Sequence, residues 1–263
     1  MKISIVTTTY NSKKFINNCL KSIKTQNYNN IEHIIIDGSS TDGTLSLLQS
    51  KRDQFEKLIS EPDNGIYEAM NKGIKIATGD VIGFLNSDDF YVNDNTLSKV
   101  ASVFNNNPSI EACYSDLIYT DQIDTSKTVR YWRSGKFIPN SFSKGWAPPH
   151  PTFFARRSIY ERFGLFNLNY RFAADNELMM RFMEVYKIKT NYIPEVWVKM
   201  RLGGTTNKNF KNIFLGNLEI LKALRKNGLY TNIIIFFFHK IFLRLNQRLI
   251  IIFKSFFKME IKK

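Results

Sequence analysis

Short apolar runs alternate with segments of helical spacing along the first 120 residues of the chain. The apolar runs are rich in β-branched residues and end in polar turns, a pattern typical of buried strands. They predict strands at 3–9, 33–36, 55–60, 81–85 and 112–119. Between the strands, apolar residues at every third or fourth position predict helices at 13–26, 44–52, 66–78 and 94–104. This alternation favours an α/β fold with a mostly parallel, Rossmann-like sheet flanked by helices.

The pattern is less regular beyond residue 120. Residues 120–149 place aromatic side chains among polar residues and three prolines, which predicts a long irregular segment. These aromatic side chains could stack on sugar rings or pack over the sheet, and the sequence leaves both open. Residues 150–154 lead into a strand. Helices at 156–163 and 170–186 and a final strand at 190–200 follow.

Three of the predicted strands end in polar residues, at 8–11, 37–40 and 86–89. Turn chemistry alone would explain any one of these ends. Because the carboxyl ends of parallel strands meet at one edge of a sheet, the three together predict a nucleotide-type crevice. The first loop has neither a G-x-G-x-x-G fingerprint nor a P-loop. The adjacent carboxylates of Asp88 and Asp89 therefore predict a divalent cation, Mn²⁺ or Mg²⁺, that holds a diphosphate.

The predicted helix at 170–186 carries two carboxylates in its first turn. Arg181 follows Glu177 by four residues, which suits an ion pair within the helix. Asp175 has no such partner, so it is the freer candidate for chemistry, although the helix dipole alone would favour a carboxylate there. His150 is either a metal or phosphate contact or part of a pocket wall. Arg201 either reaches a phosphate or lies on the surface.

Charge is unevenly spread along the 263 residues. The net charge is +14, of which residues 199–263 carry +12. Such a tail on a near-neutral body indicates an anionic surface as its partner. It does not indicate nucleic acid, because no nucleic-acid motif accompanies the charge. Two distant cysteines predict a reducing compartment without disulfides, and the N-terminus is expected to be a first strand, not a signal peptide.

The tail predicts amphipathic helices. We divide the chain into a body at 1–206 and a tail at 207–263, with a helix-rich connector at 207–229. From residue 233 onward, helical spacing gathers cations on one face: Lys240, Arg244, Arg248, Lys254, Lys258 and Lys262. The opposite face is apolar: Phe242, Leu245, Leu249, Ile250, Phe253, Phe256 and Phe257. The apolar run is too short to span a membrane but fits a helix lying in its interface; packing on the body or a dimer contact are the alternatives.

Several segments together resemble a known family. They are VTTTYN, IIIDGSSTDGT, EPDNGIYEAMNKGIKIATGDVIGFLNSDD, HPTFFARRSIYERFGLF and AADNELMMR, and they span roughly residues 3–206. The chain resembles the inverting glycosyltransferases of family 2, with a GT-A fold, particularly bacterial enzymes that build surface polysaccharides. The resemblance implies transfer of a sugar from a nucleotide-sugar, expected to be a UDP-sugar, to a glycan or polyprenyl-linked acceptor. Such an acceptor suits a peripheral enzyme on the cytoplasmic face of the cell membrane.

The resemblance also implies residue roles. Asp175 matches the family's catalytic Asp, the general base, although Ala174 precedes it where the family has Glu. Asp88 and Asp89 would hold the metal, with His150 as a further candidate, and Asp37 would accept the N3–H of uracil. Asn86 stands where the family often has Asp. The donor site as a whole would comprise Thr8, Thr9, Tyr10, Asp37, Ser39, Gly65, Lys72, Asn86, Ser87 and Asp88.

Two other classes of protein compete with this interpretation. A sugar-phosphate nucleotidyltransferase would need a glycine-rich basic loop after the first strand, and TTTYNS is not one. A non-enzymatic basic protein that binds nucleic acid or membrane would carry its charge more widely than in the tail.

Overall fold

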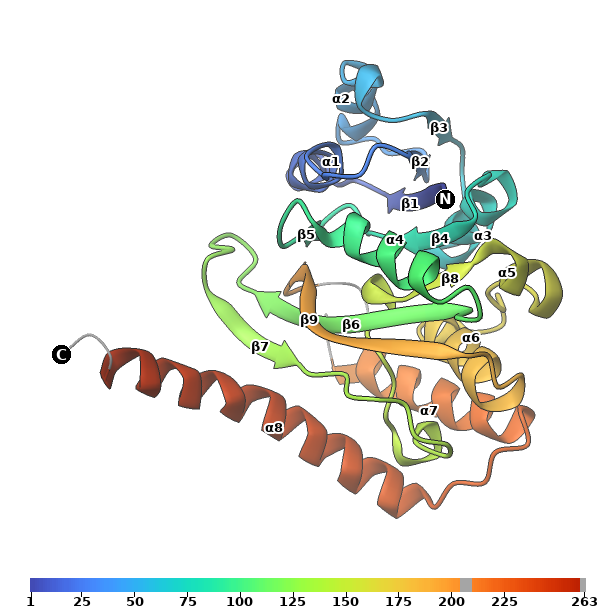
Figure 1. Cartoon of the computed structure of the whole chain (residues 1–263), viewed down its shortest axis with the longest axis vertical. Coiled ribbons are helices and arrows are strands. Elements are labelled where there is room, and N and C mark those ends of the chain that lie inside the picture. The colour runs from blue at the N-terminus through green and yellow to red at the C-terminus, as the bar shows by residue number, and fades with distance from the viewer. Residues whose placement is uncertain (204–209, 261–263) are drawn as a thin grey trace.

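The computed structural model describes residues 1–203 and 210–260, with side chains for 1–203 and 211–247. Within these residues a nine-stranded mixed sheet is covered by helices on both faces (Figure 1). The strand order is β3-β2-β1-β4-β8-β6-β9-β5, and β7 pairs with β6 outside this path. The predicted α/β fold is therefore confirmed.

The parallel half of the sheet contains the four strands nearest the N-terminus. They are β1 (Ile3–Thr9), β2 (Ile31–Asp37), β3 (Lys57–Ser60) and β4 (Val81–Phe84). Thr9 pairs with Asp37, and Asp37 pairs with Ser60, so three strands end at the same level. Val6 of β1 pairs with Phe84 of β4, so the polar residues predicted after β1, β2 and β4 lie at one edge of the sheet.

Helices cover the parallel half as the sequence predicts. They are α1 (Ile16–Lys24), α2 (Thr44–Gln49), α3 (Ile66–Ile76) and α4 (Thr96–Asn106), with a short 3-10 turn at Arg52–Gln54. The apolar faces of α1 and α4 share one core cluster with Ile3 and Ile5 of β1. The apolar face of α3 packs against Val6 on the other side of the sheet. Alternate residues of β1 thus serve both cores, as in a doubly covered sheet.

The second half of the sheet is mixed. It contains β5 (Phe90–Tyr91), β6 (Ala112–Thr120), β7 (Thr128–Trp132), β8 (Phe154–Arg156) and β9 (Thr190–Arg201). β6 pairs parallel to β9 and antiparallel to β7 and β8. The prediction of a wholly irregular segment at 120–149 is wrong, because β7 and a 3-10 turn at Phe142–Lys144 lie within it.

The aromatic residues of this segment pack on the protein. The ring centroid of Phe142 lies 6.2 Å from that of Phe137 and 5.3 Å from that of Trp146. Trp132 stacks parallel to Tyr119 of β6. Of the two roles that the sequence leaves open, packing over the sheet is the one that these contacts support.

Three helical segments carry His150 and Asp175 or lie between them in the chain. A 3-10 turn at His150–Thr152 precedes β8; α5 (Arg157–Phe163) and α6 (Ala174–Met180) follow it. α6 continues as a π-helical turn at Arg181–Val185. Arg181 Nε donates to Glu177 Oε1 at 2.9 Å, so the predicted ion pair is present.

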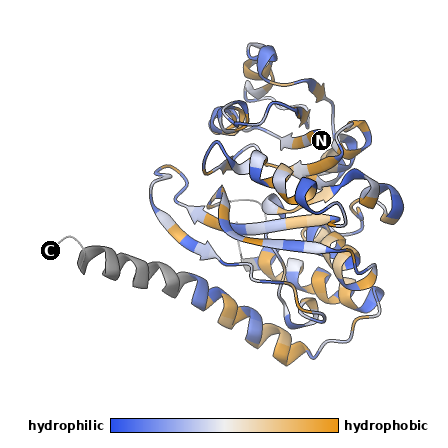
Figure 2. Cartoon of the chain, viewed as in Figure 1, coloured by the Kyte–Doolittle hydropathy of each residue, from blue (hydrophilic) through white to orange (hydrophobic). Residues whose placement is uncertain are grey.

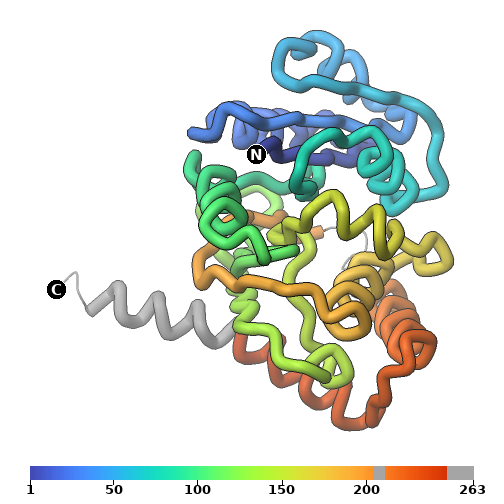
Figure 3. Tube along the Cα trace, turned by 45° about the vertical axis from the view of Figure 1, so that its right-hand side comes forward, coloured from blue at the N-terminus to red at the C-terminus, as the bar shows by residue number. Residues whose placement is uncertain are grey.

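Two helices form the tail, α7 (Phe210–Lys226) and α8 (Ile233–Glu260). α7 is more than a connector, because Ile220 and Leu224 are buried in the same cluster as α6. α8 crosses β7, and its Phe236 is fully buried. Figures 1 and 3 both show the tail helices at the end of the molecule opposite to α2. The domain division at residue 206 stays a prediction.

The described part of α8 has a buried side and an exposed apolar side. Lys240 and Arg244 are half-buried. Besides Ile233 and Ile235 at its start, α8 exposes five apolar side chains, which we call the apolar stripe: Ile234, Phe238, Ile241, Phe242 and Leu245. Figure 2 shows apolar residues gathered in the first half of this helix. The predicted faces from Arg248 to Lys262 lie outside the described side chains. No helix among the described residues is long and apolar enough to cross a membrane.

Candidate active site

Hydrogen bonds tie the three polar strand ends together. The backbone N–H of Asn11 donates to Ser40 Oγ at 2.8 Å. The Ser87 hydroxyl is hydrogen-bonded to that of Ser12 at 2.8 Å, and the Ser87 N–H donates to the Thr8 carbonyl at 3.3 Å. The loops after β1, β2 and β4 therefore form one hydrogen-bonded edge, as the predicted crevice requires.

Asp37 is fully buried at this edge. Its carboxylate accepts the Ser40 N–H at 3.0 Å, the Ser40 hydroxyl at 2.5 Å and the Ser60 hydroxyl at 2.6 Å. Since a carboxylate offers about four acceptor positions, the loop uses most of them. Asp37 thus fixes the loop in which Ser39 has a left-handed backbone (φ 60°). Ser40, which the sequence analysis passed over, makes the hydrogen bonds.

The acidic pair at the end of β4 is poorly partnered. Asp88 is half-buried and Asp89 is fully buried. Neither oxygen of Asp89 has a hydrogen-bond partner in the described part of the chain, although the Arg201 N–H and Asn86 lie nearby. Burial raises the pKa of Asp88, and it raises the pKa of Asp89 well above its usual value, with the charge of Asp88 adding to the effect.

Arg201 is the nearby cation. It is only 5% exposed, so the surface alternative for this residue is wrong. Its guanidinium lies 5.1 Å from the Phe15 ring centroid and 5.2 Å from that of Phe90, and Nη1 donates to the Gln122 carbonyl at 3.0 Å. Its charge favours the ionised forms of Asp88 and Asp89. Arg201 is therefore built into the acidic edge.

The acidic pair fits a divalent cation. Two carboxylates, one with both oxygens unpartnered, suit Mg²⁺ or Mn²⁺ when substrate phosphates supply further ligands. The described residues contain no group of three His, Cys, Asp or Glu side chains that could hold a metal. The role of His150 as a metal ligand beside Asp88 and Asp89 stays a prediction.

His150 has a different environment. Its ring lies against Phe84 (centroids 5.0 Å apart) and Phe166 (5.4 Å). Burial lowers its pKa, and the negative charge of Asp175 opposes that shift. His150 thus forms a wall beside Asp175, which was the second role that the sequence left open.

Asp175 lies in the first turn of α6 and is half-buried. Its Oδ1 accepts the Tyr67 hydroxyl at 2.9 Å and the Asn176 N–H at 2.8 Å. Its Oδ2 has no hydrogen-bond partner among the described residues. Within the described residues, one oxygen is therefore fixed and the other receives no hydrogen bond.

Tyr119 of β6 links the two groups of carboxylates. The charges of Asp89 and Asp175 both act on its hydroxyl, as do those of Arg130 and Arg244. Contacts place Asp175 near the end of β4. Tyr67, which donates to Asp175, stacks on Phe166 with ring centroids 5.6 Å apart. Phe166 lies 5.4 Å from Phe84, the last residue of β4. Asp175 is therefore connected through these rings to the strand whose end carries the acidic pair.

Comparison with known proteins then identifies the family. The family model described as "Glycosyl transferase family 2" matches residues 4–164. The chain belongs to glycosyltransferase family 2. It is 31% identical to the "PGL/p-HBAD biosynthesis glycosyltransferase" of Mycobacterium bovis, over 84% of this chain and 85% of that relative. It is 41% identical to an "Uncharacterized glycosyltransferase" of Haemophilus influenzae, over 35% of this chain and 38% of that relative.

Solved structures share the GT-A fold of this glycosyltransferase. "S. aureus TarS 1-349 in complex with UDP" matches with a TM-score of 0.63 at 19% identity, over 89% of this chain and 67% of that one. "Mannosyltransferase PcManGT from Pyrobaculum calidifontis in complex with GDP-Man and Mn2+" gives 0.65 at 20% identity, over 85% and 64%. In the match to another TarS structure, this chain covers only 40% of that protein's length. Membership of the family removes the nucleotidyltransferase and non-enzymatic alternatives.

A further carboxylate of the glycosyltransferase, Asp63, lies at the strand-end edge and was not predicted from the sequence. A Cβ on Gly38 would lie 2.7 Å from Asp63 Oδ2 and 3.4 Å from Tyr10 Cδ2, so only glycine lets these side chains lie over the loop. Tyr10 is 65% exposed there. Asp63 follows β3 at the same edge as Asp37, a signal that was hidden by the turn-like EPDNG sequence.

Lys72 and Gly65 shape the loop that carries Asp63. Lys72 Nζ lies 3.0 Å from the Pro62 carbonyl and 2.9 Å from Glu61 Oε1. Gly65 precedes α3 with φ 130°, and its N–H donates to Asp63 Oδ1 at 2.9 Å. Lys72 is thus engaged within the loop, and its contact with the nucleotide stays a prediction.

Glu219 of α7 supports the turn before Asp175 from outside the predicted site. Its carboxylate accepts the backbone N–H groups of Arg171, Phe172 and Ala173 at 3.0, 2.7 and 3.0 Å. These residues lead directly into α6 and Asp175. A tail residue therefore fixes the turn that leads into Asp175, and no local sequence pattern marks it.

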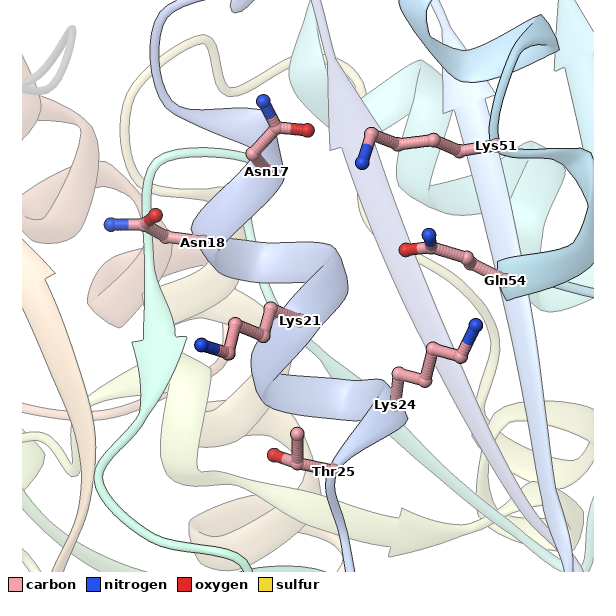
Figure 4. A pocket seen from close by; sticks show the side chains of 7 residues that line it. All are labelled: Asn17, Asn18, Lys21, Lys24, Thr25, Lys51 and Gln54. Carbon is pink, nitrogen blue, oxygen red and sulfur yellow. The ribbon is translucent and has the colours of Figure 1, made fainter.

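Two surface hollows are present, and only the second is lined by residues described above, among them Glu219. One, of about 330 Å³, opens over α1 and is lined by Lys21, Lys24 and Lys51 among others (Figure 4). The other, of about 680 Å³, lies between α7 and the turn at 171–172. The first contains none of the predicted site residues.

Proposed function

We propose that this glycosyltransferase moves a sugar from a UDP-sugar to a hydroxyl of a glycan or lipid-linked acceptor in surface glycoconjugate synthesis. The reaction is a single displacement that inverts the anomeric centre. The observation that carries the proposal is that, among the described residues, Asp175 Oδ2 and both oxygens of Asp89 have no hydrogen-bond partner. Tyr67, Phe166 and Phe84 connect Asp175 to the strand that precedes the acidic pair.

The donor is proposed to lie along the strand ends. Structures of TarS carry UDP and UDP-GlcNAc in their names, and PcManGT carries GDP-Man. Thr8, Thr9 and Tyr10 would face the nucleobase and ribose, with Asp37 and Asp63 beneath them. Ser39, Gly65, Asn86 and Ser87 complete the proposed donor site.

Asp88 and Asp89 are the proposed ligands of Mn²⁺ or Mg²⁺. When bound, the cation would neutralise charge on the leaving diphosphate. The neighbouring Arg201 adds a fixed positive charge at the same edge, held between two aromatic rings. Preorganised charge of this kind stabilises a transition state without further rearrangement.

Asp175 is the proposed general base. The acceptor hydroxyl gives its proton to Oδ2 while its oxygen attacks the anomeric carbon from the face opposite the diphosphate. Tyr67 donates to Oδ1 and so directs the proton to Oδ2. Burial and the charge of Asp175 raise the pKa of Tyr67 well above its usual value, which keeps its proton in place.

The acceptor side is proposed to lie at a lipid surface. The mycobacterial relative is named for PGL/p-HBAD biosynthesis. The apolar stripe of α8 is 52–80% exposed, and burying two of its phenylalanines in lipid would contribute about 3–6 kcal/mol. Anionic phospholipid of the cytoplasmic leaflet suits the basic tail.

A screen of nucleotide-sugars, with and without EDTA, tests the proposed reaction. A UDP-sugar should support transfer or slow hydrolysis that chelator removes. UDP with Mn²⁺ should raise the thermal unfolding temperature. Turnover of a UDP-sugar at full rate in EDTA would contradict the metal assignment, and no turnover of any nucleotide-sugar would contradict the reaction.

Sedimentation with phosphatidylglycerol vesicles tests the lipid surface. The double variant Phe238→Ser/Phe242→Ser should bind the vesicles at least about tenfold more weakly than the natural chain. Ile123→Ser, at a 76% exposed residue remote from the tail in sequence, is the matched control and should bind normally. Equal binding by all three proteins would contradict the proposed lipid contact.

A further inference from the structure

The inner face of α8 presents two half-buried cations, Lys240 and Arg244, one helical turn apart. Lys240 Nζ donates to Asn217 Oδ1 of α7 at 2.7 Å and lies 5.1 Å from the Phe236 ring centroid. Among the described side chains, neither cation lies within ion-pair distance of a carboxylate. Both cations are therefore held against the body without a counter-ion.

These cations lie on the side of the site where Asp175 stands. The negative charge of Asp175 acts on Lys240, and the positive charge of Arg244 acts on Tyr119. The same Tyr119 hydroxyl is acted on by Asp89. Contacts agree with this placement. Lys240 is hydrogen-bonded to Asn217 of α7, and Glu219 of the same helix accepts the Ala173 N–H just before Asp175. α8 is therefore joined through α7 to the turn that leads into Asp175, on the proposed acceptor side of the site.

An anion would stabilise this arrangement. Like charges four residues apart on a helix repel each other, and half-burial removes part of their hydration. Burial lowers the pKa of Lys240 to about 7, with the charge of Arg244 adding to the effect. Because its charged form is destabilised, Lys240 gains most from an anionic partner. The described residues of the chain supply none.

The opposite face of the same helix favours hydrocarbon. Ile234 is 80% exposed and Phe238 is 74% exposed. A single ligand with an anionic group near Asp175 and an apolar chain would satisfy both faces of α8. Two cations one helical turn apart, one of them a guanidinium that binds phosphate oxygens in pairs, suit two linked phosphates better than one carboxylate.

We propose that Lys240 and Arg244 bind the diphosphate of a lipid-linked acceptor, whose hydrocarbon chain lies in the lipid layer contacted by the apolar stripe. This assignment rests on the proposed function, since it places the acceptor's hydroxyl at Asp175. α8 then both docks the enzyme and selects acceptors by their phosphates. An acceptor without a diphosphate is bound weakly.

Binding of farnesyl diphosphate to the full chain tests the assignment. The titration is run in EDTA, which removes any cation that could hold a diphosphate at Asp88 and Asp89. We expect the variant Lys240→Met/Arg244→Gln to bind at least tenfold more weakly than the natural chain. Arg225→Gln, which removes an exposed cation of the adjacent α7, should bind as the natural chain does.

Two further ligands separate phosphate from hydrocarbon. Inorganic pyrophosphate should compete with farnesyl diphosphate on the natural chain, and farnesol should bind the natural chain and the double variant equally. Equal binding of farnesyl diphosphate to both proteins, or no competition by pyrophosphate, would overturn the assignment. Stabilisation by UDP with Mn²⁺ is measured on every variant. If it is retained, loss of farnesyl diphosphate binding cannot be assigned to misfolding or to failure of the donor site.

Discussion

The donor side and the acceptor side of the proposed site are held in different ways. Loops 10–12, 38–44 and 86–89 lie within the first 90 residues and are joined by hydrogen bonds at the ends of paired strands. Asp175 is held by single side chains from elsewhere, Tyr67 of α3 and Glu219 of α7. The donor side thus follows from the sheet itself, whereas the acceptor side depends on the tail. Substitutions should therefore damage one side and spare the other.

Asp175→Asn should have the largest effect. Losing the base removes a contribution of about 10²–10⁴-fold to the rate, so transfer should fall by about that factor. Binding of UDP with Mn²⁺, measured calorimetrically, should stay within about twofold. The control Asp53→Asn changes an exposed carboxylate paired to Lys24 and should leave both measurements unchanged. Transfer at the natural rate in Asp175→Asn would remove this residue from the mechanism.

Asp89→Asn should break the donor side instead. Metal-stimulated turnover should fall about 10²-fold, because one of two carboxylate ligands is lost. In EDTA the variant should unfold at a higher temperature than the natural chain, since a buried carboxylate with a raised pKa destabilises the folded state above that pKa. Thermal scans with and without Mn²⁺ check both parts. A variant less stable in EDTA would show that Asp89 is partnered in solution.

Glu219→Gln should loosen the acceptor side alone. Its carboxylate accepts three backbone N–H groups ahead of α6, and charge-assisted bonds of this kind are about twice as strong as neutral ones. We expect kcat to fall about tenfold while KM for the donor is unchanged. Glu161→Gln, an exposed partner of Arg157, is the control. A rise in donor KM with constant kcat would place Glu219 on the donor side.

Glu32 should give the smallest effect, confined to the donor half of the sheet. Burial raises its pKa, but hydrogen bonds from Ser4, Thr78 and Lys57 outweigh that effect and lower the pKa to about 2. A lowered pKa contributes stability above the unfolded value of about 4.5, and that stability is lost as the pH falls towards 2.

Acid unfolding of Glu32→Gln tests this contribution. The variant should be less stable at pH 7 and should lose less stability than the natural chain between pH 4.5 and 2.5. Parallel curves for the two proteins would show that Glu32 has no special pKa. Unlike the three variants above, Glu32→Gln should leave kcat at pH 7 unchanged. Glu32 lies at the amino end of β2, whereas the proposed site lies at the carboxyl ends of the strands.

The sequence predicts the donor side well because its determinants are local. Long apolar runs mark β1, β2 and β4, and the residues that follow each run must meet at one edge. The sequence misses β5 because two residues carry no periodicity, and it misses β7 because that strand is only half-buried.

The acceptor side could be predicted only in part. Asp175 stands out in its helix, but its partners do not, since Tyr67 is 108 residues away and Glu219 lies on a tail helix. Tertiary packing likewise decides that Lys240 faces the body. Helical spacing separates a polar face from an apolar face, but it does not show which face the body covers. The same limit applies to His150, because no local pattern predicts its packing against Phe84 and Phe166.

The central claim is that the acidic pair and Asp175 act on the same bound donor. A structure of the enzyme with a non-hydrolysable UDP-sugar and Mn²⁺ tests this claim most directly. We predict that the diphosphate and metal lie on Asp88 and Asp89, with the anomeric carbon facing Asp175 Oδ2 from the side opposite the diphosphate. A nucleotide bound instead in the hollow over α1, beside Lys21 and Lys51, would contradict the account.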